Sequence, residues 1–118
     1  MRKFIFLLAI LAANPVHAET TVRDFLVEYQ KATDDGKRLL DGFLSGLIAA
    51  YGWSNVTLKT EGYPPHFCPN ARFGKEIEAP IKMVRRLASV DTKTLDAPVG
   101  AALLTSLKRR FPCRESKD

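Results

Sequence analysis

The chain has 118 residues, a formal net charge of +5 and two cysteines. With 46% hydrophobic and 26% charged residues, its composition is that of a globular protein and excludes a disordered, fibrous or multiply membrane-spanning chain. The length allows one domain and excludes a multidomain enzyme.

Residues 1–18 have the pattern of a secretory signal peptide. Two basic residues precede an apolar run over residues 4–13, and small residues stand before Glu19, where a signal peptidase would cut. The run is shorter than the roughly 20 residues of a membrane-spanning helix, although an uncleaved N-terminal anchor is the alternative. We therefore expect residues 19–118 to form one exported domain with no stable membrane insertion after cleavage. Cleavage removes two of the five net charges, so the charge gives no argument for nucleic-acid binding.

The first two helical patterns differ in how much of their surface is apolar. Residues 21–32 form an amphipathic pattern with Thr21 as N-cap. Residues 36–51 are apolar on nearly the whole circumference, which predicts a buried central helix that Gly52 ends or loosens. Small residues along one side of this helix would let a neighbouring backbone approach closely: Gly42, Gly46 and Ala50.

Two further helical patterns follow an irregular, proline-containing stretch over residues 53–67. The third pattern spans residues 73–89 and contains Pro80, so the helix either starts late, with this proline in its first turn, or bends there. The fourth runs to about residue 110, with Asp96 as its expected N-cap.

The two cysteines allow a single intramolecular pairing. In an oxidising compartment Cys68 and Cys113 are expected to form a disulfide. The chain-entropy account assigns a loop of this size about 4 kcal/mol of stabilisation. We therefore predict an all-α fold, a small four-helix domain with one disulfide.

Candidate catalytic residues are few. A His66–Cys68 dyad is conceivable, but the expected disulfide would consume its thiol. No carboxylate pair stands out, and the triplet Asn55-Val56-Thr57 is interpreted as an incidental match to a glycosylation acceptor. We expect no enzymatic activity, no cofactor and no metal site.

The aromatic and basic residues are the better candidates for partner binding. Tyr63 and His66 lie in the stiff proline-containing stretch, and Trp53 stands at its start, although Trp53 and Phe67 could instead fold back to cap the core. Basic residues form two patches that would suit an acidic partner or an anionic surface, or simply a solvated face. The first patch is Lys82, Arg85 and Arg86; the second is Lys108, Arg109, Arg110, Arg114 and Lys117.

The order of these features resembles the Rap/Tai family of periplasmic immunity proteins. The matching parts are the glycine-containing helix over residues 40–47, Phe-Cys-Pro at residues 67–69 and Phe-Pro-Cys at residues 111–113. Many members carry two more cysteines, in the first helix and near the start of the second. This chain has none at residues 25–29 or 37–41 and would be a divergent member.

The resemblance implies a function and a partner. Family members bind a peptidoglycan amidase effector of type VI secretion, block its active site, and are often dimeric. We therefore expect an inhibitor of a cognate secreted amidase, with a homodimer as one oligomeric state and Trp53, Tyr63, His66, Arg85 and Arg86 as contact residues. The alternative is a small periplasmic acid-stress chaperone, a class that also uses a helical domain with one disulfide.

Overall fold

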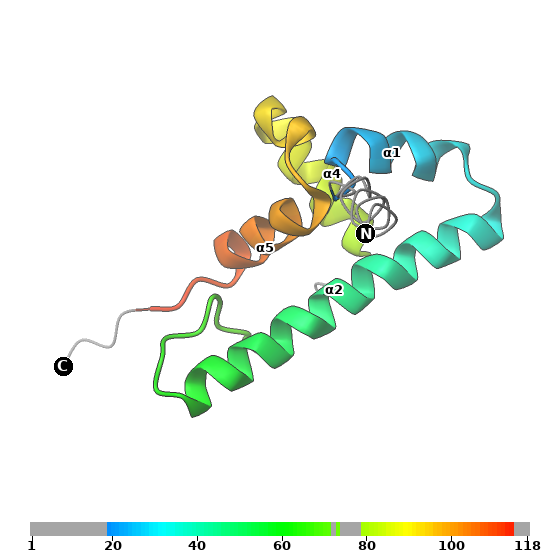
Figure 1. Cartoon of the computed structure of the whole chain (residues 1–118). Helices are drawn as coiled ribbons and strands as arrows, with labels where there is room; N and C mark the ends of the chain where they lie inside the picture. The colour runs from blue at the N-terminus through cyan, green and yellow to red at the C-terminus, as the bar shows by residue number, and fades with distance from the viewer. Residues whose placement is uncertain (1–18, 72, 74–78, 115–118) are drawn as a thin grey trace, which may run out of the picture.

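The computed structural model describes residues 19–71, 73 and 79–114, and these residues confirm the all-α class (Figure 1). The predicted signal peptide and part of the third helical pattern lie outside the described residues. The described elements, in chain order, are α1 (Val22–Lys31), α2 (Asp34–Thr60), α4 (Pro80–Val90), the 3-10 helix η1 (Thr92–Asp96) and α5 (Val99–Arg110).

Helix α1 agrees with its prediction to within one residue. The Thr21 hydroxyl oxygen accepts a hydrogen bond from the backbone N–H of Asp24 at 3.2 Å, which satisfies one of the free donors of the first turn. The backbone N–H of Ala32 closes the last turn by donating to the Glu28 carbonyl at 2.9 Å.

Helix α2 begins earlier and ends later than predicted. Thr33 is its N-cap, with its hydroxyl oxygen accepting from the N–H of Gly36 at 3.2 Å. The helix passes through Gly52 and continues to Thr60, so of the two sequence interpretations an end at that glycine is wrong. A glycine inside a helix costs about 1 kcal/mol, which does not break a helix that is anchored on both sides.

The core lies where α1, α4 and α5 pack on one side of α2. Every one of these helices contributes fully buried apolar side chains, and so do the segments before α4 and after α5. Buried examples are Val22 and Phe25 in α1, Leu44 and Ile48 in α2, Val84 and Leu87 in α4, Leu103 and Leu107 in α5, and Phe67 and Phe111.

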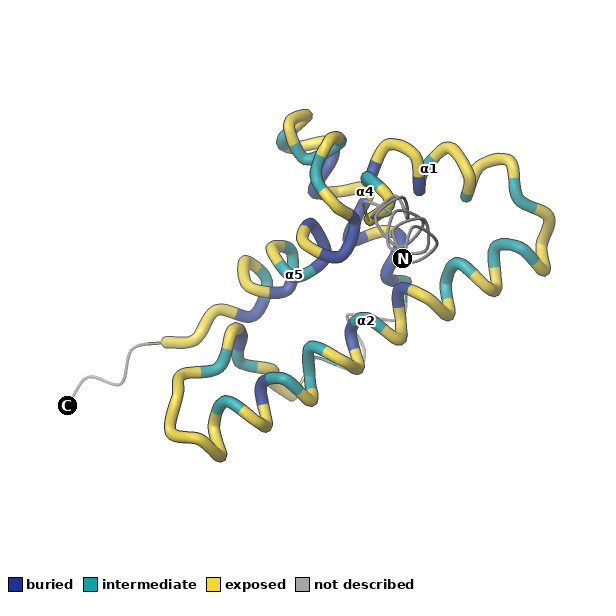
Figure 2. Tube along the Cα trace, in the orientation of Figure 1, coloured by how far each residue is buried: buried dark blue, intermediate teal, exposed yellow. Residues whose placement is uncertain are grey.

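The prediction of a buried central helix is wrong. Of the 27 residues of α2 only Leu44, Ile48 and Asn55 are buried, and exposed residues recur along the helix (Figure 2). A helix of this length is about 40 Å long. The partners α1, α4 and α5 have 10 to 12 residues each and cover one side of it. Apolar pattern alone therefore overestimated burial.

The predicted start is confirmed for α4 but not for α5. Helix α4 begins with Pro80 in its first turn, as one of the two sequence interpretations required. Asp96, in contrast, is not the N-cap of α5. It ends η1 and pairs with Arg23 of α1 at 3.2 Å.

The N-terminus of α5 is capped from the other end of the chain. The Glu19 carboxylate accepts from the backbone N–H of Gly100 at 2.7 Å, where the helix dipole favours a negative charge. The Tyr51 hydroxyl of α2 donates to the Gly100 carbonyl, also at 2.7 Å. A Cβ atom at position 100 would displace the Glu19 carboxylate and crowd the Tyr51 hydroxyl, so glycine there leaves room for both contacts.

The Tyr51 hydrogen bond should make the free energy of unfolding fall at alkaline pH. Burial, reinforced by the nearby Glu19 carboxylate, raises the pKa of Tyr51 above 10.0. Because the folded state favours the neutral phenol, its contribution is complete below pH 10 and is lost as the pH rises through the raised pKa. Urea unfolding at about pH 8 and about pH 11 should show a larger loss of unfolding free energy for the wild type than for Tyr51→Phe. Equal losses in the two proteins would contradict this coupling.

Candidate functional site

A loop over residues 63–68 begins where α2 ends. Gly62 adopts a positive φ of 82°, a conformation that glycine reaches without strain. The N–H of Tyr63 donates to the Leu58 carbonyl at 2.8 Å, and that of Gly62 donates to the Lys59 carbonyl at 3.1 Å. This pair of bonds is a Schellman motif, which ends the helix and turns the chain back toward α5.

The side chain of Asn55 holds this loop against α2. Its Nδ2 donates to the Phe67 carbonyl and its Oδ1 accepts from the His66 N–H, both at 2.8 Å. Asn55 is only 5% exposed, and it is the one polar residue among the buried residues described. One amide therefore satisfies a backbone donor and a backbone acceptor that would otherwise be unpaired. Its burial also supports the interpretation of the glycosylation triplet as incidental.

The far end of the loop is fastened to the end of α5. The predicted Cys68–Cys113 disulfide is confirmed, with an S–S distance of 2.11 Å and Cα atoms 4.9 Å apart. Beside it, the N–H of Cys68 donates to the Phe111 carbonyl at 2.8 Å. Because both sulfurs are bonded, Cys68 offers no thiol to the His66–Cys68 dyad considered from the sequence.

Aromatic packing anchors the base of the loop. Phe67 is fully buried, and its ring centroid lies 5.9 Å from that of Phe73. The Phe73 ring in turn meets Phe111 edge-on at 5.0 Å. The interpretation of Phe67 as a core residue is thus the correct one. We call residues 63–66, held in this way at both ends, the anchored loop.

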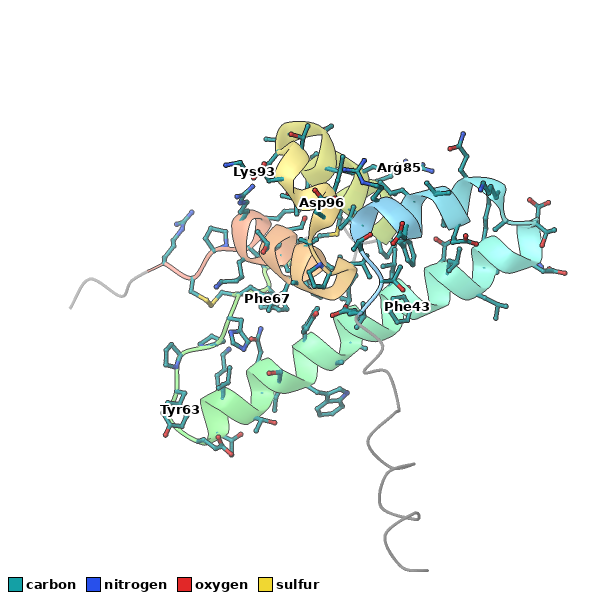
Figure 3. The ribbon with its side chains drawn as sticks, turned by 45° about the horizontal axis from the view of Figure 1, so that its top comes forward. Phe43, Tyr63, Phe67, Arg85, Lys93 and Asp96 are labelled. Atoms are coloured by element: carbon teal, nitrogen blue, oxygen red, sulfur yellow. A yellow bond between two sulfur atoms is a disulfide. The ribbon has the colours of Figure 1, made fainter. Side chains whose placement is uncertain are left out.

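The anchored loop presents its polar and aromatic side chains outward. Tyr63 is 61% exposed and lies at the outer bend, whereas Phe67 lies closer to α5 (Figure 3). His66 is also exposed, although its backbone is bonded to Asn55. The two sequence candidates Tyr63 and His66 are therefore brought together on one rigid element.

Trp53 belongs to a different surface. It is 72% exposed on α2 rather than in the loop, so it does not cap the core. Positions 53 and 55 of a helix are about 200° apart, and Asn55 faces the loop, so Trp53 faces away from it. It is part of a band of exposed apolar and small residues, which we call the outer face of α2: Leu39, Gly42, Phe43, Gly46, Ala49, Ala50, Trp53 and Val56.

The small residues of the outer face meet no neighbour within the described chain. A Cβ atom built at Gly42 or Gly46 would find nothing within 4 Å. The expectation that they admit a neighbouring backbone of the same domain is therefore wrong. Leu39 is 77% exposed and extends this exposed apolar surface to the first turns of α2.

Arg85 and Arg86 lie away from the anchored loop, and the first is already engaged. The Arg85 guanidinium lies 5.3 Å from the centre of the Tyr29 ring, and Figure 3 shows Arg85 beside α1, far from Tyr63. Tyr29 donates its hydroxyl to Asp41 at 3.3 Å; burial and this bond raise the pKa of Tyr29, while Arg85 opposes the rise. Arg86 instead lines a groove between α4 and α5.

The described residues contain neither a cluster of metal ligands nor a helix suited to span a membrane. No group of three or more histidine, cysteine, aspartate or glutamate side chains in that part of the chain is arranged to hold a metal ion. Among the helices described, none has the length and hydropathy to cross a membrane. Comparison with protein-family models, curated proteins and solved structures yields no match.

Sequence reasoning missed Asn55, the residue on which the anchored loop depends. We predict that Asn55→Ala lowers the free energy of unfolding by about 2 to 3 kcal/mol, because it leaves two buried backbone groups unpaired. Urea unfolding measures the change. Thr60→Ala, at an exposed position of the same helix, should stay within about 0.5 kcal/mol of the wild type. An Asn55→Ala protein as stable as the Thr60→Ala protein would show that the amide does not hold the loop.

Proposed function

We propose that this chain is a periplasmic immunity-type protein that binds a secreted peptidoglycan amidase of type VI secretion and occludes its active site. The observation that carries the proposal is the anchored loop, an exposed element fixed at both ends before any partner binds. The resemblance to the Rap/Tai family supplies the class of partner. Together they favour a binding protein over an enzyme.

The anchored loop suits the blocking of a cleft. Pro64 and Pro65 restrict its backbone, while Asn55 and the disulfide fasten its base. A loop that is already ordered loses little conformational entropy on binding, which favours tight inhibition. Tyr63 offers a large, rigid aromatic anchor of the kind that dominates protein interfaces.

The proposal assigns this chain no catalytic activity. Inhibition by occlusion needs shape and contact area but no nucleophile or general base from the inhibitor. The bonded state of Cys68 supports this view, since the one cysteine beside the histidine of the loop has no thiol.

The outer face of α2 would pair two copies of the chain. In an antiparallel pair crossing at Gly46, Leu39 of one copy would lie opposite Trp53 of the other, because both are seven residues from the crossing point. Glycine at the crossing allows helix axes to approach to about 8 Å, with the large side chains closing on either side. The anchored loop of each copy would remain available to an amidase, since Asn55 and Trp53 face in different directions.

The outer face of α2 also fits the alternative function, because an acid-stress chaperone needs an apolar surface for its clients. Such a protein would keep this surface paired at neutral pH and release it in acid. Retention of the dimer and of helical circular dichroism down to about pH 3, without protection of aggregating clients, would exclude the chaperone role.

The first test is binding to the secreted amidase that the proposal predicts to be encoded beside this chain. Protein exported with its own leader and purified from the periplasm should form a stable complex and abolish peptidoglycan hydrolysis at equal concentration. Tyr63→Ala should weaken the complex at least about tenfold, as expected for an interface anchor. Lys59→Ala, exposed on the preceding helical turn, should bind as the wild type does.

Two results of this experiment would count against the proposal in different ways. No complex and no protection of cells against the amidase would reject the immunity function. A complex that Tyr63→Ala and His66→Ala leave unchanged would reject the anchored loop as its contact surface.

The second test addresses the pairing of two copies. Gly46→Glu should convert a dimer to a monomer in sedimentation velocity, because it places a charge at the crossing point. The chain itself should stay folded, since nothing lies within 4 Å of the added Cβ and glycine is the poorer helix former. Ser45→Glu, about a quarter turn away on the exposed surface, is the matched control and should remain dimeric. A wild-type monomer, or a Gly46→Glu dimer, would refute this pairing.

A further inference from the structure

A groove of about 240 Å³ lies between α4 and α5, apart from both surfaces described above. Its apolar floor is the buried pair Met83 and Leu87 of α4, and the exposed Val90 also lines it. The basic lining residues come from both helices, Arg86 from α4 and Arg109 and Arg110 from α5. One member of the first basic patch, Arg86, and two members of the second, Arg109 and Arg110, therefore line the same groove.

The two helices that line this groove carry charge of a single sign. Helices α4 and α5 carry six lysine and arginine residues and no aspartate or glutamate: Lys82, Arg85, Arg86, Lys108, Arg109 and Arg110. The acidic residues that follow α4 are engaged elsewhere. Asp91 accepts from the backbone N–H of Lys93 at 3.1 Å, and Asp96 pairs with Arg23.

Helix electrostatics explains only part of this charge. Cations in the last turn of α5, including Arg109, complement the dipole of that helix. Arg86 has no such role, because it lies in the interior of α4. Within the part of the chain that the structure describes, neither Arg86 nor Arg109 has an ion-pair partner. Their guanidinium groups are thus available to carboxylates from outside the chain.

We propose that the α4–α5 groove binds an acidic segment of a partner protein, which inserts one bulky apolar side chain between carboxylates that pair with Arg86 and Arg109. The proposal does not depend on the amidase or on the anchored loop, because it rests on different helices and different side chains.

Size and shape favour a polypeptide over other anionic ligands. Small-molecule sites occupy roughly 300 to 1,000 Å³, so a groove of 240 Å³ fits an anchoring side chain rather than a whole ligand. Guanidinium groups bind carboxylates with two parallel hydrogen bonds, and a cation from each lining helix matches an acidic residue on each side of the anchor. An anionic bilayer is broad and would meet the exposed rim, but it would not reach the apolar floor.

A designed peptide tests the groove directly. The probe is a blocked, fluorescein-labelled peptide with a central Leu-Phe pair flanked by glutamates, and its matched control has glutamine at every glutamate. Fluorescence anisotropy should show binding of the glutamate peptide and at least about tenfold weaker binding of the glutamine peptide. The protein used is the exported, disulfide-bonded chain.

Paired substitutions separate the groove from the general positive charge. Arg86→Gln with Arg109→Gln should weaken peptide binding at least about tenfold. Lys82→Gln with Lys108→Gln removes the same charge from the same two helices outside the groove lining, and should weaken it less than about threefold. Val90→Asp should also prevent binding, and because Val90 is 76% exposed, the fold tolerates the change.

The contrary outcomes are distinct. Absence of peptide binding, or equal binding of the glutamine peptide, would overturn the proposal. So would equal weakening by the arginine and lysine pairs, which would indicate an unspecific electrostatic field. Binding to phosphatidylglycerol vesicles that depends on the same two arginines, without binding of the peptide, would assign the groove to an anionic membrane surface instead.

Discussion

The Cys68–Cys113 disulfide is the constraint on which the arrangement of the loop and the helices depends. It joins the segment after α2 to the segment after α5, two places 45 residues apart in sequence. Phe67 and Phe111, the neighbours of the two cysteines, are consequently buried in one aromatic cluster with Phe73. For a domain of this size a single cross-link is a large share of the total stability, because marginal domains have only about 5 to 15 kcal/mol to lose.

The second constraint is the length of α2. Its 27 residues run past the helices that pack on it, so one face contributes Leu44 and Ile48 to the core while the opposite face stays in solvent. A solvent-exposed band of leucine, phenylalanine, tryptophan and glycine is rare on a monomer and is typical of a surface that binds another surface. The same helix also supplies Asn55 to the anchored loop. The structural element that leaves an apolar face open therefore also fixes the loop proposed for partner binding.

Local chemistry was predictable from the sequence, whereas long-range partners were not. The N-cap at Thr21 follows from a short local sequence pattern. The Cys68–Cys113 disulfide follows because two cysteines allow only one intramolecular pairing. Asp96 had the right residue type for a cap, but Glu19, distant in sequence, reaches Gly100 instead. Burial of α2 was overestimated because an apolar pattern reports what a helix could bury and not what is present to cover it. Tyr63 and His66 were predicted as contact residues together with Trp53, which lies on another surface. The amide that positions His66, and the groove that Arg86 and Arg109 both line, required the tertiary structure.

The central claim is that the anchored loop is ordered before any partner arrives, and amide hydrogen exchange at His66 and Cys68 tests it most directly. In the disulfide-bonded protein both amides should exchange only through global unfolding, with opening free energies within about 1 kcal/mol of the free energy of unfolding. Reduction of the disulfide should make both exchange faster. Exchange of the His66 amide at the rate of an unstructured peptide in the oxidised protein would contradict the account.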